Sequence, residues 1–266
     1  MLSILITLIL LYLLCTRCRG SHPGWPELQD WSYAHRGLHD SRLPENSLAA
    51  FRAAMENGYG IELDLHLTKD GNLAVIHDSL LNRTTGQAGR VEDLTTEELS
   101  QYHLGDTPET IPTFSEVLNL IQGKVPLIVE LKPVDGNHDQ LAQIACKQLE
   151  QYQGCFCMES FDYRCLVWLR RHRPDIIRGQ LAENFFATRN DLPDYVRFVA
   201  THCLTNFLSV PDFLAYRFDH RMKTPTCQVA SRLWKAKTVA WTLRSREDFD
   251  RAKAEGFIPI FENFRP

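Results

Sequence analysis

Short apolar runs alternate with amphipathic segments along most of this 266-residue chain, and this alternation is the strongest constraint on its fold. Nine runs are predicted to be strands: 32–37, 61–67, 73–76, 126–132, 155–160, 176–181, 204–210, 237–243 and 256–262. Amphipathic or capped segments between them predict helices. Strands that alternate with helices over this length predict a parallel sheet of the α/β class, closed into a (β/α)8 TIM barrel. Nine candidates compete for eight places, and 204–210 has the weakest strand pattern.

Composition and charge limit the number of domains, the partners and the cysteine chemistry to be expected. With 44% hydrophobic residues, the chain is long enough for one large domain or two small ones. Its formal net charge of -4, with mixed signs throughout, provides no basic patch, so no nucleic-acid partner is expected. The eight cysteines show no metal-ligand spacing with paired histidines, and we expect most of them to be buried free thiols.

The N-terminus differs in kind from the rest of the chain. Residues 1–15 are almost wholly apolar, although the run is short for the hydrocarbon core of a bilayer. No positive charge precedes the run, whereas Arg17 and Arg19 follow it. This order favours membrane association through a weak anchor, with the following domain on the cytoplasmic side. A cleaved signal segment and a secreted domain are the alternative.

The stretch 61–78 combines two strands with several charged side chains. Polar and apolar residues alternate in the first strand, so Glu62, Asp64 and His66 share one of its faces. A glycine-containing turn leads into the second strand, which ends on His77. Acids and imidazoles are thus expected close together, although a surface hairpin with one wet face shows the same pattern when it is taken alone.

Catalytic residues of β/α barrels lie at the carboxyl ends of the strands. Sorted by that rule, the candidates are His35, Arg36, Glu62, Asp64, His77, Glu130, Lys132, Trp241 and Glu262. Three converging carboxylates repel one another unless a cation binds them, and an all-oxygen site suits Mg2+ or Ca2+. Two histidines beside such a site have the chemistry of a general acid and a general base, and fixed positive charge suits a phosphate.

Each of these residues also has a structural interpretation. A lone histidine after a strand is more often a hydrogen-bonding group, unless both histidines reach one pocket. Glu130 with Lys132 forms a plain ion pair in the simplest view. Glu45 suits a positioning role as well as substrate binding, and Trp241 fits the core as well as a substrate wall. His66 stays open between structure and function.

An ordered set of short motifs spans almost the whole domain. These are His35-Arg36-Gly37, Pro44-Glu45-Asn46-Ser47, Glu62-Leu63-Asp64, Thr68-Lys69-Asp70-Gly71, His77-Asp78, Arg83-Thr84-Thr85, Glu130-Leu131-Lys132, Ser160-Phe161-Asp162 and Trp241-Thr242. In this order they resemble the glycerophosphodiester phosphodiesterase family. Two departures are visible: Ser47 stands where threonine is common, and the usual final Ile-Thr-Asp strand reads Ile260-Phe261-Glu262-Asn263.

The resemblance implies a β/α barrel with a small insertion after the third strand, here 79–112. It implies one divalent cation, Mg2+ or Ca2+, on Glu62, Asp64 and Glu130, with His35 and His77 as the acid/base pair. It also implies Arg36 and Lys132 around the phosphate, to which we add Glu45 and Trp241 as further substrate-binding candidates.

The predicted activity is that of a phosphoric diester hydrolase, which cleaves a glycerophosphodiester to an alcohol and glycerol 3-phosphate. A lysophospholipase D that acts on lysophospholipids is the enzymatic alternative; a long apolar groove beside the metal favours it, and a closed polar pocket favours the water-soluble substrate. A membrane-tethered binding protein without catalysis is the third possibility. We divide the chain into an anchor or signal segment (1–19), a linker (20–30) and the barrel (31–266).

Overall fold

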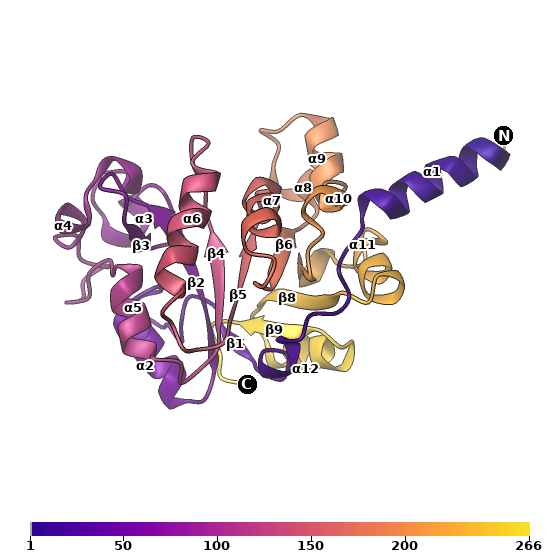
Figure 1. The fold of residues 1–266 in the computed structure, drawn as a ribbon. Helices are drawn as coiled ribbons and strands as arrows, with labels where there is room; N and C mark the ends of the chain where they lie inside the picture. Colours follow the sequence, from indigo (N-terminus) through magenta and orange to yellow (C-terminus); the bar gives the residue numbers. More distant parts are fainter. Residues whose placement is uncertain (1) are drawn as a thin grey trace.

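Eight parallel strands close into a barrel in this computed structural model, which describes residues 2–266 (Figure 1). The barrel strands are β1 (Tyr33–Ala34), β2 (Gly60–Leu67), β4 (Leu127–Leu131), β5 (Phe156–Ser160), β6 (Arg178–Ala182), β7 (Phe213–Arg217), β8 (Lys237–Leu243) and β9 (Ile258–Phe261). They pair in the order β1-β9-β8-β7-β6-β5-β4-β2, and β1 pairs with β2 to close the ring. The TIM-barrel prediction is confirmed.

Helices cover the outside of the barrel. The longer ones are α2 (Leu48–Glu56), α5 (Phe114–Ile121), α6 (His138–Leu149), α7 (Tyr163–His172), α9 (Asp194–Thr201) and α12 (Arg246–Ala254). The short ones are α8 (Phe185–Thr188), α10 (Asn206–Ser209) and α11 (Thr226–Gln228). Ser47 is the N-cap of α2: its Oγ accepts a hydrogen bond from the N–H of Ala50 at 3.1 Å. Serine therefore serves as the helix cap at this position. The helices bury apolar stripes, such as Phe51 of α2 and Val117 of α5, against the outer faces of the strands.

The small insertion lies after the third strand in chain order, as predicted. β3 (Leu73–Val75) pairs antiparallel with β2 and is therefore not one of the eight barrel strands. After β3 in the chain, α3 (Asn82–Thr85) and α4 (Thr96–Leu99) lie on one side of the barrel (Figure 1). They bury a small apolar cluster of their own, which includes Leu81, Val91 and Leu99.

The strand predicted at 204–210 is wrong. Part of this run forms α10, and the sixth barrel strand is the next apolar run, β7. A short apolar run with polar neighbours has no decisive period, so packing against α7 determines its conformation.

The barrel interior is filled at its amino-terminal end by the segment that precedes β1. Trp25, in the 3-10 turn Trp25–Glu27, and Leu28 pack with interior residues such as Phe213. The rings of Trp25 and Phe213 meet edge to face, with centroids 5.6 Å apart. This end of the barrel is therefore closed, and the polar strand ends at the other end can form a site.

The membrane anchor expected at residues 1–15 is contradicted. Among residues 2–266, no helix is long and apolar enough to cross a membrane. The apolar run forms α1 (Leu2–Cys15), whose 14 residues extend away from the barrel (Figure 1). Such a helix measures roughly 21 Å, short of the roughly 30 Å of a hydrocarbon core. The membrane-associated location, with its cytoplasmic orientation, is corrected accordingly; Met1 lies outside the described residues.

Candidate active site

Strand ends bring most of the predicted residues to one cavity of about 130 Å³. Of the predicted residues, His35, Arg36, Glu62, His77, Glu130 and Trp241 line it. Glu159, Phe161, Thr242 and Arg244 also line it. Three further residues form ion pairs with the lining: Asp64 and Glu45 with Arg36, and Lys132 with Glu130. These nine side chains, together with Glu262, which lies 2.5 Å from His35, therefore belong to one site.

Glu62, Asp64 and Glu130 form a buried acidic triad on two neighbouring strands. Asp64 and Glu130 are register partners on β2 and β4, and Glu62 lies two residues earlier on the same face of β2. One oxygen from each residue lies within 4.8 Å of the other two. Burial, together with the charges of Asp64 and Glu130, raises the pKa of Glu62 well above its ordinary value. The triad is therefore short of positive charge.

This triad fits a hard divalent cation, because carboxylate oxygens are the donors that such ions prefer. Asp64 Oδ1 is buried and has no hydrogen-bond partner. Its other oxygen, Oδ2, accepts from Asn46 Nδ2 at 2.8 Å, which fixes the orientation of the carboxylate. Lys132 Nζ lies 2.8 Å from Glu130 Oε1 and 3.3 Å from Asp64 Oδ1. Burial opposes ionisation of Asp64, but Lys132 and neighbouring cations keep its pKa well below the ordinary value.

Strand β5 adds a fourth carboxylate that the sequence argument missed. Glu159 is the register partner of Glu130, is 1% exposed and lines the cavity. Its Oε2 has no hydrogen-bond partner, and burial next to Glu130 raises its pKa well above the ordinary value. The available signal was its position one residue before the Ser160-Phe161-Asp162 motif, on a strand that was predicted.

His35 directly follows β1, the two-residue strand between β2 and β9. The chain then turns sharply at Gly37, where φ is 81° and an added Cβ would lie 2.9 Å from the Cβ of Ala50. His35 Nδ1 donates to Glu262 Oε2 at 2.5 Å, and its Nε2 lies 3.9 Å from Glu62 Oε2. Burial lowers the pKa of His35 to about 4, so the imidazole is neutral at neutral pH.

His77 has a carboxylate partner beside it in the sequence. Its Nδ1 donates to Asp78 Oδ1 at 2.6 Å, and Arg83 pairs with the other oxygen of Asp78. Arg83 Nη2 also lies 2.7 Å from Glu45 Oε1, which accepts from Arg36 Nη1 at 2.9 Å. Glu45 thus positions Arg36 at the cavity, which is the positioning role considered for it.

His66 ties β2 to the insertion and to the main chain of His77. Its Nδ1 lies 2.8 Å from Glu92 Oε1, and its Nε2 lies 3.0 Å from the carbonyl oxygen of His77. Both partners offer oxygen atoms that accept hydrogen bonds. Glu92 also accepts from Ser79 Oγ at 2.6 Å. The contact with the carbonyl oxygen of His77 places His66 next to a candidate catalytic residue, in a structural role.

Trp241 and Phe161 form an aromatic wall of the cavity. Their ring centroids lie 5.6 Å apart, with the rings perpendicular. The indole Nε1 of Trp241 donates to the carbonyl oxygen of Ala215 at 3.0 Å, which fixes the plane of the ring. Trp241 also packs against the barrel-interior cluster, so it is part of both the core and the cavity.

The chain is similar to known phosphodiesterases. The sequence profile of the glycerophosphoryl diester phosphodiesterase family matches residues 35–265. A glycerophosphodiester phosphodiesterase of Caldanaerobacter subterraneus subsp. tengcongensis is 38% identical over 159 residues, which cover 56% of this chain and 65% of that protein. One from Bacillus altitudinis is 41% identical over 158 residues, which cover 54% of this chain and 63% of that protein. The matched stretches thus span less than two thirds of these relatives.

A solved structure shares the fold. It is an Oleispira antarctica phosphodiesterase in complex with the product sn-glycerol-3-phosphate; its TM-score is 0.74 at 24% identity, over 90% of this chain and 94% of that one. The family profile covers the described residues from the first candidate histidine to the C-terminus almost completely. This chain therefore belongs to the glycerophosphoryl diester phosphodiesterase family.

Proposed function

We propose that this chain hydrolyses glycerophosphodiesters to an alcohol and glycerol 3-phosphate, with the help of one divalent cation, Mg2+ or Ca2+. The convergence of His35 and His77 on one cavity with Glu62 and Glu130 carries the proposal. Two imidazoles from separate strand ends meet the condition that distinguishes an acid/base pair from structural histidines. Membership of the family and the names of its curated relatives support the same activity.

In the proposed mechanism, Arg36 and Lys132 attract and orient the phosphodiester by their charge. Glu62, Asp64 and Glu130 would hold the divalent cation, which would supply Lewis acidity when bound. His35, kept neutral by burial, is suited to accept the proton of the attacking hydroxyl group. His77 is suited to protonate the leaving alcohol, because its contact with Asp78 fixes the orientation of the ring.

The shape of the cavity favours a water-soluble diester over a lysophospholipid. The cavity of about 130 Å³ is lined by charged side chains from Arg36, Glu62, Glu130, Glu159 and Arg244, and its apolar lining is limited to Phe161, Leu181, Trp241 and Ile260. A lysophospholipase D needs room for an acyl chain beside the phosphate, and this cavity provides little of it. We therefore place lysophospholipid cleavage second and loss of catalysis third, because the acids and both histidines are present.

The deciding experiment uses the purified full chain. Release of glycerol 3-phosphate from glycerophosphocholine and of choline from lysophosphatidylcholine is measured with Mg2+, with Ca2+ and with chelator. Metal-dependent turnover of the first substrate that Glu62→Ala and His77→Ala abolish would establish the site, whereas His172→Ala, at an exposed histidine on α7, should be silent. Turnover of lysophosphatidylcholine alone would select the lysophospholipase D, and a folded, metal-binding but inactive chain would favour the binding protein.

A further inference from the structure

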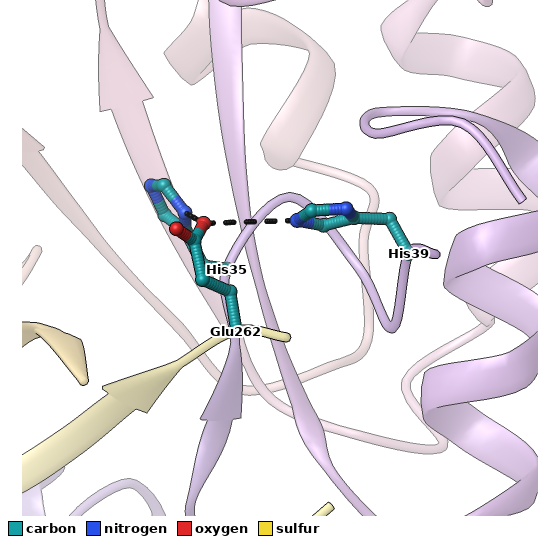
Figure 2. Close-up of side chains that lie close together, drawn as sticks. All are labelled: His35, His39 and Glu262. Atoms are coloured by element: carbon teal, nitrogen blue, oxygen red, sulfur yellow. Dashed lines mark hydrogen bonds and ion pairs between the residues drawn. The ribbon is translucent and has the colours of Figure 1, made fainter. Parts of the chain in front are cut away.

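Glu262, near the C-terminus of the sequence, lies between His35 and His39, which come from the start of the barrel sequence (Figure 2). His35 follows β1, His39 lies in the loop after it, and Glu262 follows β9. Glu262 Oε2 is 2.5 Å from His35 Nδ1 and 3.7 Å from His39 Nε2. One nitrogen or oxygen from each residue lies within 4.8 Å of the other two. We call these three residues the histidine cluster.

His39 has no other evident task in the described part of the chain. Its Nε2 is buried, has no hydrogen-bond partner and points at Glu262 from beyond hydrogen-bond distance. A buried ring nitrogen without a partner costs free energy in solution, so its orientation suggests a further ligand.

The donor set of the cluster differs from that of the acidic triad. Two imidazole nitrogens and one carboxylate oxygen are ligands typical of Zn2+, whereas Mg2+ and Ca2+ prefer oxygen. Tetrahedral Zn2+ with bonds of about 2.0 to 2.1 Å sets its ligand atoms ~3.3 Å apart. The separations at Glu262 Oε2, 2.5 Å to His35 Nδ1 and 3.7 Å to His39 Nε2, lie on either side of that value, so small side-chain rotations suffice.

The surroundings also resemble the outer shell of a metal site. Arg244 Nε lies 2.6 Å from Glu262 Oε1, the oxygen that faces neither histidine, and so leaves Oε2 available. His35 Nε2, the nitrogen away from the cluster, lies 3.9 Å from the carboxylate of Glu62. At that distance the carboxylate acts on the ring by its charge and not through a hydrogen bond. The charge of Arg244 opposes a second cation, so we expect reversible binding that is weaker than at a closed structural zinc site.

We propose that His35, His39 and Glu262 form a second metal site that binds Zn2+ and that stops turnover when it is filled. Zn2+ at this site takes His35 Nδ1 and Glu262 Oε2, and it thereby replaces the contact that orients His35. The binding is independent of the catalytic activity. Only the inhibition rests on the function proposed above.

Binding is tested by calorimetric titration of the full chain with Zn2+ in saturating Mg2+. Co2+ absorption serves as a second probe of nitrogen ligation. We expect one Zn2+ per chain, at least about 10-fold weaker binding in His39→Gln and unchanged binding in His172→Gln. Glu130→Gln, which disables the acidic triad, should keep the site. Equal Zn2+ affinity in wild type and His39→Gln would overturn the proposal.

Inhibition is tested in the same buffers with glycerophosphocholine. His39→Gln should keep its zinc-free kcat within about twofold and require at least about 10-fold more Zn2+ for half inhibition. Equal inhibition of wild type and His39→Gln would place the inhibitory ion on the acidic triad. It would overturn the proposed inhibition through the histidine cluster. If wild type binds Zn2+ through His39 but shows no turnover in Mg2+, the second site stands and the proposed function fails.

Discussion

His35 Nδ1 lies 2.5 Å from Glu262 Oε2, although 227 residues separate the two in the sequence. The other candidate histidine, His77, takes its carboxylate partner from the next residue, Asp78, at 2.6 Å. Each imidazole thus has one nitrogen fixed by a carboxylate and the other free for chemistry. Substitution of Glu262 or Asp78 should therefore impair catalysis even though the histidine itself is retained.

Glu262→Gln should lower kcat for glycerophosphocholine at least about 10-fold with little change in KM, because general acid–base catalysis depends on ring orientation. Steady-state kinetics in zinc-free buffer measure it. Glu255→Gln is the matched control, since Glu255 also pairs with an arginine, Arg221, but away from the cavity. A Glu262→Gln enzyme with wild-type kcat would remove Glu262 from the active site.

Two substitutions of His66 separate its two hydrogen bonds. Glutamine places an amide near the former Nε2 and can still donate to the carbonyl of His77, whereas asparagine can reach only Glu92. We expect His66→Asn to lower kcat by about 10-fold and His66→Gln to stay nearer to wild type, with KM similar in both. Kinetics at matched thermal stability provide the measurement. Equal losses in the two variants would show that His66 only maintains the fold.

Glu62→Gln should separate the stability of the empty triad from its response to metal. The neutral amide removes repulsion from Asp64 and Glu130, so the metal-free Tm should rise. In wild type, Mg2+ or Ca2+ at ~100 times its Kd should add about 2.7 kcal/mol of stability, and a chelator should remove it. The variant should lose this response in a thermal melt. A full metal response in Glu62→Gln would refute the assignment of the triad.

Glu92 predicts a pH dependence of stability. Burial alone would raise its pKa, but hydrogen bonds from His66 and Ser79 lower it from 4.5 to about 2. A carboxyl group with a lowered folded-state pKa stabilises the protein above pH 4.5, and the contribution is lost as the pH falls toward 2. After allowance for solvent screening, about 1 to 2 kcal/mol is expected.

Urea unfolding at a series of pH values tests this dependence. The stability difference between wild type and Glu92→Gln should be largest near neutral pH and shrink below pH 4.5. Glu97→Gln, at an exposed glutamate of α4, should show a small difference at every pH. A Glu92→Gln difference that stays constant across the series would contradict the assignment.

Local patterns predicted most of the barrel, because strand alternation, capping boxes and glycine turns are written in neighbouring residues. The acidic triad could be predicted in the same way, since Glu62 and Asp64 share a strand face and Glu130 lies near the carboxyl end of a strand. The role of Glu159 could not, nor could the pairing of Glu262, itself a candidate, with His35. Their placement depends on the register of β5 against β4 and of β9 against β1, which the whole closed ring determines. β7 was missed because the neighbouring run 204–210, although its strand pattern was the weakest of the nine, was predicted as the strand in its place.

The two-residue strand β1 is the shortest part of the ring that closes the barrel. It pairs Tyr33 and Ala34 with β2 on one side and β9 on the other, and the next amide, that of His35, donates to the carbonyl oxygen of Phe261 at 2.9 Å. A transient opening between β1 and β9 would therefore separate His35 from Glu262 while the rest of the barrel stays folded. Amide hydrogen exchange at His35 thus reports how often the enzyme leaves its competent state.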